Sequence, residues 1–301
     1  PGDGTPLNSV KKLLPGEAII AKNGRIVDKW LWYKLPIFSQ IKKDINKEQA
    51  ISGVTSHLRQ AVHRQMVADV PLGAFLSGGL DSSSVVAFAK EVNPDIKCFT
   101  IETKGSQDKG AVDDLPYAKR VSKYLNVSLE VVSIDSHKMA GDLESMIIQL
   151  DEPLADPAAL NVLYISQLAK EQGIKVLLSG AGGDDLFTGY RRHYALQLER
   201  YWGWLPKSVR TGLESITRNL NTDNSINRRI VKMFNGAGLN SEDRLINYFR
   251  WSDDPLLQSL YSPEFRQQLA GSNSNQIMQD FIEPILVNSS PLDQMLALEQ
   301  R

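Results

Sequence analysis

The chain has 301 residues, with 34 Lys and Arg against 35 Asp and Glu, so its formal net charge is -1. The length predicts about two domains. The near-neutral charge argues against a protein that neutralises phosphate backbones, and we expect no nucleic-acid partner. No apolar stretch approaches ~20 residues and no basic-then-apolar leader precedes the first element, so we expect no membrane contact. The single cysteine, Cys98, excludes an internal disulfide and favours a cytoplasmic protein.

The first element in the chain is an expected β-hairpin. Residues 18–22 and 25–32 have strand patterns, and Asn23-Gly24 between them is the dipeptide that favours a type I′ turn. An isolated hairpin is marginally stable in water. We therefore expect it to pack on a neighbour, either in this chain or in a domain missing from it.

Residues 47 to 178 alternate between helical and strand patterns. Strands are expected at 73–76, 96–102, 129–134 and 175–178, and helices at 47–66, 85–91, 115–125, 139–150 and 158–172. This alternation predicts an α/β fold with a doubly wound parallel sheet. Ligands of such sheets bind beyond the carboxyl ends of the strands.

The strand patterns fade after Tyr190, and the remainder is expected to be helical. Helical segments separated by Asn, Ser, Gly and Pro turns are expected at 208–220, 228–234, 243–251, 275–285 and 292–301.

A glycine- and serine-rich segment, Ser77 to Ser83, lies between an expected buried strand and an expected helix. Its two glycines allow close approach of a ligand, and the unpaired N–H groups at a helix start favour an anion. A Walker-A loop would need a lysine that is missing here. Asp81 stands in the segment instead, and a carboxylate beside phosphates implies an intervening Mg²⁺. The alternative is an ordinary strand-to-helix turn with Asp81 as its cap.

This segment resembles the pyrophosphate-binding loop (PP-loop) of the ATP pyrophosphatase superfamily, whose fold is the adenine-nucleotide alpha-hydrolase type. Residues 70–76 ahead of it are similar to the glutamine-hydrolysing (type B) asparagine synthetase family, in its C-terminal synthetase domain. Further blocks similar to that family are 99–101, 114–118, 151–157 and 179–190. The resemblance covers residues 1 to 205 well and the helical remainder only loosely.

The resemblance implies an ATP site and roles for individual residues. ATP would be bound by Leu76, Ser77, Gly78, Gly79, Asp81, Ser82, Ser83, Ile101, Ser179 and Gly180, with Leu76 and Ile101 at the adenosine. Asp81 and Asp184 would hold Mg²⁺. Asp81, Asp184 and Asp185 are the implied catalytic residues, because Asp184 and Asp185 share a loop beside the nucleotide.

The resemblance also implies a reaction. In such enzymes the aspartate side chain attacks the α-phosphate of ATP, which gives β-aspartyl-AMP and pyrophosphate, and ammonia then displaces AMP to form asparagine. The small-molecule substrates would be ATP, aspartate or a similar carboxylate, and ammonia released from glutamine. The alternatives are a related amidotransferase or β-lactam-synthetase-like ligase acting on another carboxylate, and a non-catalytic nucleotide-binding partner. A homo-oligomer is left open.

The chain departs from the family pattern in two places. The family enzymes begin with a glutaminase domain that has an N-terminal cysteine, whereas this chain begins with Pro1. Residues 1–45 are therefore interpreted as the tail of a missing glutaminase domain and a linker, 46–205 as the synthetase domain, and 206–301 as a truncated helical region. The second departure is Ala181, where the family usually has a glutamate tied to forming the intermediate and handling protons.

Two further charged clusters have alternative interpretations. Asp151, Glu152 and Asp156 form either a carboxylate cluster for general-base chemistry or an acidic surface loop. Residues 191–193 (Arg-Arg-His) either bind a carboxylate or phosphate or face solvent at a helix start.

Overall fold

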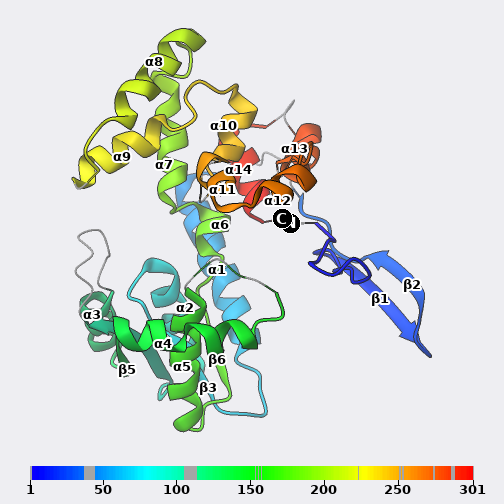
Figure 1. Cartoon of the computed structure of the whole chain (residues 1–301). Helices are drawn as coiled ribbons and strands as arrows, with labels where there is room; N and C mark the ends of the chain where they lie inside the picture. Colours follow the sequence, from blue (N-terminus) through cyan, green and yellow to red (C-terminus); the bar gives the residue numbers. More distant parts are fainter. Residues whose placement is uncertain are drawn as a thin grey trace. The chain divides into compact units, whose positions relative to one another are not determined.

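A computed structural model shows the fold (Figure 1). It describes residues 2–36, 45–104, 114–152, 154, 156, 158–222, 224–250, 252, 254–273, 275–285 and 289–300. The chain divides into two compact units. The sheet unit comprises residues 41–184, and the helical unit comprises residues 1–40 and 185–301. The predicted domain boundaries at 45 and 205 stay predictions.

The sheet unit contains four parallel strands in the order β5-β4-β3-β6. Their bounds are β3 Leu72–Phe75, β4 Lys97–Lys104, β5 Ser128–Asp135 and β6 Val176–Leu178. The chain first adds strands on one side of β3 and then returns to its other side with β6. The strand order therefore reverses between β3 and β6, and such a reversal is where open α/β sheets bind ligands.

Helices cover both faces of this sheet, which confirms the predicted doubly wound α/β class. The helices are α1 Lys47–Gln65, α2 Leu80–Val92, α3 Leu115–Leu125, α4 Ser136–Gln149 and α5 Ala158–Glu171. Side chains alternate along β3, because successive residues of a strand point to opposite faces. Ala74 packs with Val86 of α2 and Ala118 of α3, whereas Phe75 packs with Ile165 of α5. These two apolar clusters therefore hold α2 and α3 against one face of the sheet and α5 against the other.

Several predicted boundaries in the sheet unit are wrong, and two of them bear on the site. Helix α2 begins at Leu80, not at Val85, with Gly79 as its N-cap in extended backbone. Strand β4 extends to Lys104, so that Ile101 lies within the strand and not at its end. The predicted acidic stretch 151–157 is described only in part, because residues 153, 155 and 157 lie outside the described residues.

The N-terminal hairpin is confirmed. Strand β1 (Glu17–Lys22) pairs with β2 (Arg25–Leu31) in an antiparallel ladder. Asn23 and Gly24 have φ values of 51° and 71°, the left-handed conformation that a type I′ turn requires. Large apolar side chains remain exposed along both strands, among them Ile26, Val27 and Leu31.

The rest of the helical unit consists of short helices, as predicted, although several of them were missed. Their bounds are α6 Gly183–Phe187, α7 Arg191–Leu198, η2 Glu199–Tyr201, α8 Lys207–Arg218, α9 Ser225–Phe234, α10 Ser241–Asn247, α11 Asp254–Leu260, α12 Pro263–Gln268, α13 Gln276–Ile282, η3 Glu283–Ile285 and α14 Pro291–Glu299. Their shared core includes Leu196, Leu245, Ile282 and Met295. Of the helices in the described ranges, none is long and apolar enough to cross a membrane.

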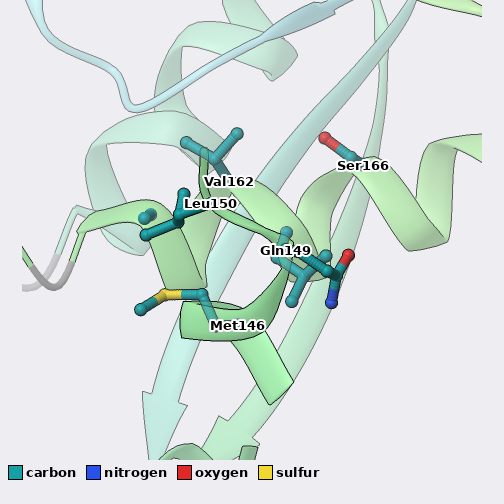
Figure 2. A pocket seen from close by; sticks show the side chains of 7 residues that line it. Met146, Gln149, Leu150, Val162 and Ser166 are labelled. Carbon is teal, nitrogen blue, oxygen red and sulfur yellow. The ribbon is translucent and has the colours of Figure 1, made fainter. Parts of the chain in front are cut away.

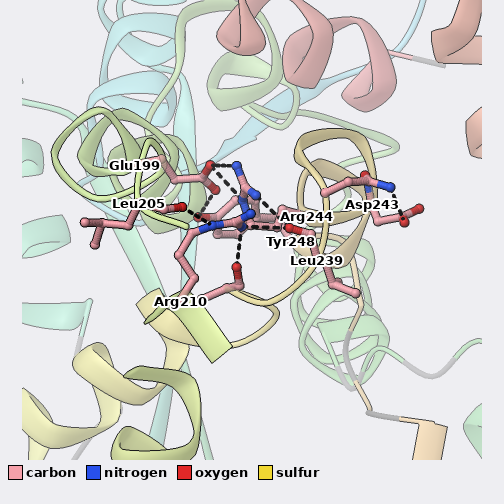
Figure 3. Close-up of polar contacts among 9 residues, drawn as sticks. Glu199, Leu205, Arg210, Leu239, Asp243, Arg244 and Tyr248 are labelled. Atoms are coloured by element: carbon pink, nitrogen blue, oxygen red, sulfur yellow. Dashed lines mark hydrogen bonds and ion pairs between the residues drawn. The ribbon is translucent and has the colours of Figure 1, made fainter. Parts of the chain in front are cut away.

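A buried polar network stabilises the helical unit (Figure 3). Glu199 accepts hydrogen bonds from Arg244 Nε at 3.0 Å and from the Tyr248 hydroxyl at 2.9 Å. The Arg244 and Arg210 guanidinium groups also donate to the Leu239 carbonyl, each at 2.8 Å. Burial and the neighbouring Glu199 raise the pKa of Tyr248. Since every charge here has a partner within the chain, we interpret the network as structural.

Candidate functional site

The loop after β3 is shaped by its own serines. Ser77 Oγ lies 3.0 Å from Ser82 Oγ and accepts a hydrogen bond from the Gly79 N–H. Ser82 Oγ also donates to the Gly79 carbonyl. Gly78 has φ of +81°, and a Cβ on it would lie 2.4 Å from the Tyr117 carbonyl carbon. The tight loop therefore requires glycine at position 78.

The loop after β3 places the first residues of α2 at the carboxyl end of the parallel strands. The first N–H groups of a helix have no carbonyl partner within it, and those of Leu80, Asp81 and Ser82 occupy these positions in α2. The positive end of the helix dipole lies at the same place. The Leu80 side chain is 83% exposed, so it leaves the start of α2 open to solvent. This geometry favours a bound anion.

The loop after β6 meets the start of α2. A Cβ on Gly180 would lie 2.6 Å from the Ser82 backbone nitrogen, and one on Gly183 would lie 2.3 Å from the Asp81 carboxyl carbon. The Gly180 separation tolerates no side chain, because the nearest atoms belong to the α2 backbone, whereas a side chain at position 183 would displace the Asp81 carboxylate. The predicted Ser77–Ser83 and Ser179–Gly180 segments are thus brought together where the strand order reverses.

Two carboxylates approach each other at this junction. Burial, followed by the charge of Asp184, raises the pKa of Asp81 above its ordinary value of 3.8. No group of three or more His, Cys, Asp or Glu side chains suited to a metal occurs within the described ranges. Mg²⁺, however, commonly takes only one or two protein carboxylates and completes its shell with phosphate oxygens and water. The pair therefore fits a Mg²⁺ ion that accompanies a nucleotide.

The structure limits how Leu76 and Ile101, the residues predicted to contact adenosine, could reach a ligand. The Leu76 side chain is only 1% exposed and belongs to the core, so a ligand could reach only its backbone. Ile101 is half-buried against α5. Ser83 lines a small hollow with Ala87 and Val121. The roles of these residues toward ATP stay predictions.

Asp184 and Asp185 lie in the short helix α6 and not in an open loop. Asp185 is half-buried, and its backbone carbonyl accepts a hydrogen bond from Gln300 at 3.3 Å. Asp156, from the predicted acidic cluster, accepts a hydrogen bond from the Ala158 N–H at the start of α5. That contact is typical of a helix cap. Among the charged candidates, Asp81 and Asp184 thus remain those at the start of α2, and the role of Asp185 stays a prediction.

Arg192 and His193 bind a carboxylate, but it is that of Glu299 in the same chain. The sequence had left them either as ligand-binding groups or as exposed ones, and neither interpretation describes this contact. Gly183 is a site residue that the sequence analysis missed. Its position directly before Asp184 in a strand-following loop was the available signal.

A separate hollow of about 340 Å³ lies between α4 and α5 (Figure 2). It is lined by Met146, Gln149, Leu150, Ala159, Val162, Leu163 and Ser166. No ionisable side chain belongs to this lining. It therefore lacks the groups that would bind a phosphate or move a proton, and we do not assign it to the site.

Comparison with known proteins places the chain in a family. The family model for asparagine synthase matches residues 53–298. The asparagine synthetase [glutamine-hydrolyzing] 1 of Bacillus subtilis is 33% identical over 182 residues, covering 60% of this chain and 27% of that protein. A putative asparagine synthetase [glutamine-hydrolyzing] of Mycobacterium bovis is 29% identical over 270 residues, covering 89% and 38%. The amidase chyE of Penicillium rubens is 29% identical over 201 residues, covering 62% and 30%.

The chain therefore belongs to the asparagine synthase family. This membership extends through the helical region that the motifs had covered only loosely, because the match runs to residue 298. The chain spans about a third of the length of the curated relatives it matches.

Proposed function

We propose that the chain is the ATP-using part of an amide-forming ligase that converts aspartate to asparagine. The observation that carries this proposal is the junction of β3 and β6. There an anion-binding helix start, two glycines packed against it, and the facing carboxylates of Asp81 and Asp184 come together. Membership of the asparagine synthase family supports the same reaction class.

In this proposal the N–H groups of Leu80, Asp81 and Ser82 bind the phosphates of ATP. Asp81 and Asp184 would hold Mg²⁺, and the ion would supply positive charge to offset that of the phosphates. The acceptor carboxylate attacks the α-phosphorus, the bond to pyrophosphate breaks, and an acyl-AMP forms. Ammonia then attacks the acyl carbon, loses a proton, and releases AMP. The chain contributes alignment and charge neutralisation at the reacting groups.

Other parts of the proposal concern the natural full-length protein. There, ammonia would come from glutamine through a glutaminase domain, with residues 1–45 as the tail of that domain and a linker. A cytoplasmic location is the remaining prediction of this kind, and it rests on the single cysteine. Cys98 is buried in the core, and burial raises the pKa of its thiol to about 12, which makes it unreactive.

One observation favours a second candidate. Ala181, in the loop after β6, is exposed and carries no group that could accept a proton. If the glutamate usual in the family is needed for asparagine formation, a ligase or amidotransferase acting on another carboxylate would explain its loss. A non-catalytic nucleotide-binding partner is the third candidate, since the same two carboxylates and helix start also suit Mg²⁺-dependent ATP binding alone.

The deciding experiment uses the natural full-length protein. ATP-to-AMP turnover would be measured against a panel of carboxylic acids with ammonium salt, and separately with glutamine. We expect AMP formation that depends on aspartate, whereas turnover with another acid alone would replace asparagine synthesis by the second candidate. Absence of acid-dependent AMP in all assays would leave nucleotide binding without catalysis.

The matched variant is Ala181→Glu, with Ala61→Glu, at an exposed position of α1, as a control for added charge. A general base contributes about 10²–10⁴-fold, so a gain of that order in asparagine formation would show that the site lacks only this group. No gain, together with robust native activity that Asp184→Asn abolishes, would assign the proton transfer to Asp184.

A further inference from the structure

A strained residue follows α6. Three residues other than glycine have positive φ in the described ranges, namely Asn23, Asn126 and Thr188. Asparagine tolerates this conformation, but a β-branched residue such as Thr188, with φ of 66°, does so only at a cost in free energy. Such strain persists when neighbouring contacts hold the backbone in place, and it gathers at functional segments.

The contact next to Thr188 is a hydrogen bond to a buried histidine. The N–H of Gly189 donates to His193 Nδ1 at 3.0 Å, and His193 is only 3% exposed. Because a peptide N–H can only donate, Nδ1 must be the unprotonated ring nitrogen. The ring proton therefore lies on Nε2, which donates to Glu299 at 2.8 Å from Oε2 and 2.9 Å from Oε1.

Glu299 is itself fixed from a second side. Its carboxylate is 1% exposed and is paired with the Arg192 guanidinium, which lies 3.9 Å over the Tyr190 ring. Helices α7 and α14 pack together through Leu196 and Met295. The charge of Glu299 is thus matched by Arg192, and His193 is free to act as a neutral bridge to the backbone.

A second bond fastens the same tract further upstream, where Gln300 Nε2 donates to the Asp185 carbonyl. The tract 184–189 is therefore held to the end of α14 at Asp185 and to α7 at Gly189. Asp185 is thus fixed by a contact within the helical unit, and Asp184 precedes it directly in the short helix α6.

We propose that Glu299, acting through His193, is a positioning residue that holds the tract 184–189 and thereby sets Asp184 and Asp185 for the adenylation step. This inference rests on the proposed function, in which the carboxylates of Asp184 and Asp185 take part in adenylation. The contact joins residues 106 apart in the sequence. A buried ion pair adds little net stability compared with apolar side chains of the same volume, so its presence here is better explained by the geometry that it imposes.

Two substitutions of His193 separate its two hydrogen bonds. Asparagine places an acceptor near the Nδ1 position, whereas glutamine places a donor near the Nε2 position. Each would be made in the natural full-length protein, alone and together with Thr188→Gly, which removes the strain at position 188. His63→Gln is the control, since that histidine is exposed and pairs with Glu91 in the sheet unit.

We expect His193→Gln to lower kcat for acid-dependent AMP formation by roughly tenfold to a hundredfold, because small misplacements of reacting groups have effects of that size. The KM for ATP should change by less than about threefold, since the helix start that binds phosphate is untouched. His193→Asn should retain more activity, and His63→Gln should retain all of it. In the presence of Thr188→Gly, the loss of kcat caused by His193→Gln should be smaller. The backbone at position 188 is then no longer strained, so its conformation depends less on the contact with His193.

Hydrogen exchange of the Gly189 amide tests the contact without any assay of activity. We expect exchange to be at least about tenfold faster in His193→Gln and in Glu299→Gln than in the native protein. Unchanged exchange, or an equal loss of kcat with and without Thr188→Gly, would overturn the positioning role. If the native protein forms no AMP with any acid, the proposed function fails and the role in adenylation fails with it, whereas fast Gly189 exchange in the variants would still establish the attachment.

Discussion

The two units differ in how the charges of their paired carboxylates are balanced. In the helical unit, Glu199 and Glu299 each face an arginine, so their charges are balanced within the chain. In the sheet unit, Asp81 faces Asp184, and that like charge together with burial raises the pKa of Asp81. A carboxylate with an internal partner needs no further counter-charge, whereas two neighbouring carboxylates call for a cation from outside. This contrast separates the structural clusters from the candidate site.

The largest effect should come from breaking a balanced pair. Arg244→Met leaves Glu199 buried without its partner, and removal of one member of a buried pair typically costs about 3–5 kcal/mol. We expect a loss of that order in the free energy of unfolding of the helical unit, measured by urea denaturation of the 301-residue chain. Lys138→Met is the matched control, because its pair with Asp142 is exposed and should contribute less than about 1 kcal/mol. Equal losses in the two variants would contradict the contrast.

The next effect concerns the glycines that bring the two loops of the site together. Gly180→Ala would place a Cβ against the Ser82 backbone nitrogen, and overpacking of this kind costs about 1–3 kcal/mol. ATP binding should weaken along with stability. Gly212→Ala is the control, because a Cβ there meets open space within α8 and should stabilise the helix by about 0.5–1 kcal/mol. Calorimetric titration with ATP and urea unfolding would measure both quantities, and normal ATP affinity in Gly180→Ala would remove this glycine from the site.

Local sequence signals predicted much of this fold for identifiable reasons. Asn23-Gly24 has the backbone preferences of the hairpin turn, and residues 115–125 have the apolar spacing of α3, whose bounds were predicted to the residue. The start of α2 was missed because Ser82 and Ser83 show no apolar period, although Gly79 caps the helix in extended backbone. Helix α12 was missed despite its Ser262 cap and the proline that follows, since the helix is only six residues long.

The candidate site was predictable to a similar degree. The loop after β3 was recognised because glycines, serines and an acidic residue follow an apolar strand, whereas the loop after β6 was recognised by its resemblance to the family. Their mutual contact depends on strand order, and no local pattern encodes it. The hydrogen bond between His193 and Glu299 could not be predicted from the sequence, because the two residues are far apart in it. A histidine at a helix start is also equally compatible with an exposed position.

A smaller effect should follow removal of a carboxylate from the unbalanced pair. Asp81→Ala should weaken Mg²⁺-dependent ATP binding at least about tenfold, which corresponds to about 1.4 kcal/mol. Binding without Mg²⁺ should change little or improve, since a negative charge beside the phosphates is removed. Glu91→Ala is the control, because this exposed carboxylate near the other end of α2 pairs with Arg59 of α1. Affinities from calorimetry that show equal Mg²⁺ dependence in the native protein and in Asp81→Ala would exclude the metal role.

The smallest expected effect is a gain in stability when Asp81 loses its charge but keeps its shape. Because the pKa of Asp81 is higher in the folded state than the ordinary value of 3.8, the folded chain binds the proton of Asp81 more tightly than the unfolded chain does. The contribution of this group to stability is therefore full below pH 3.8 and is lost as pH rises through the folded-state pKa.

Asp81→Asn, which carries no charge at any of these pH values, should for that reason melt at a higher temperature than the native chain at neutral pH in the absence of Mg²⁺. The difference should fade as pH falls toward 3.8, where the native carboxyl group also becomes neutral. Mg²⁺ with ATP should reverse the order, because only the native pair gains a cation. Thermal melts at several pH values, with and without Mg²⁺ and ATP, would measure this. A native chain that is the more stable of the two at neutral pH without Mg²⁺ would mean that Asp81 already has a balancing charge, and that the contrast between the two units does not hold.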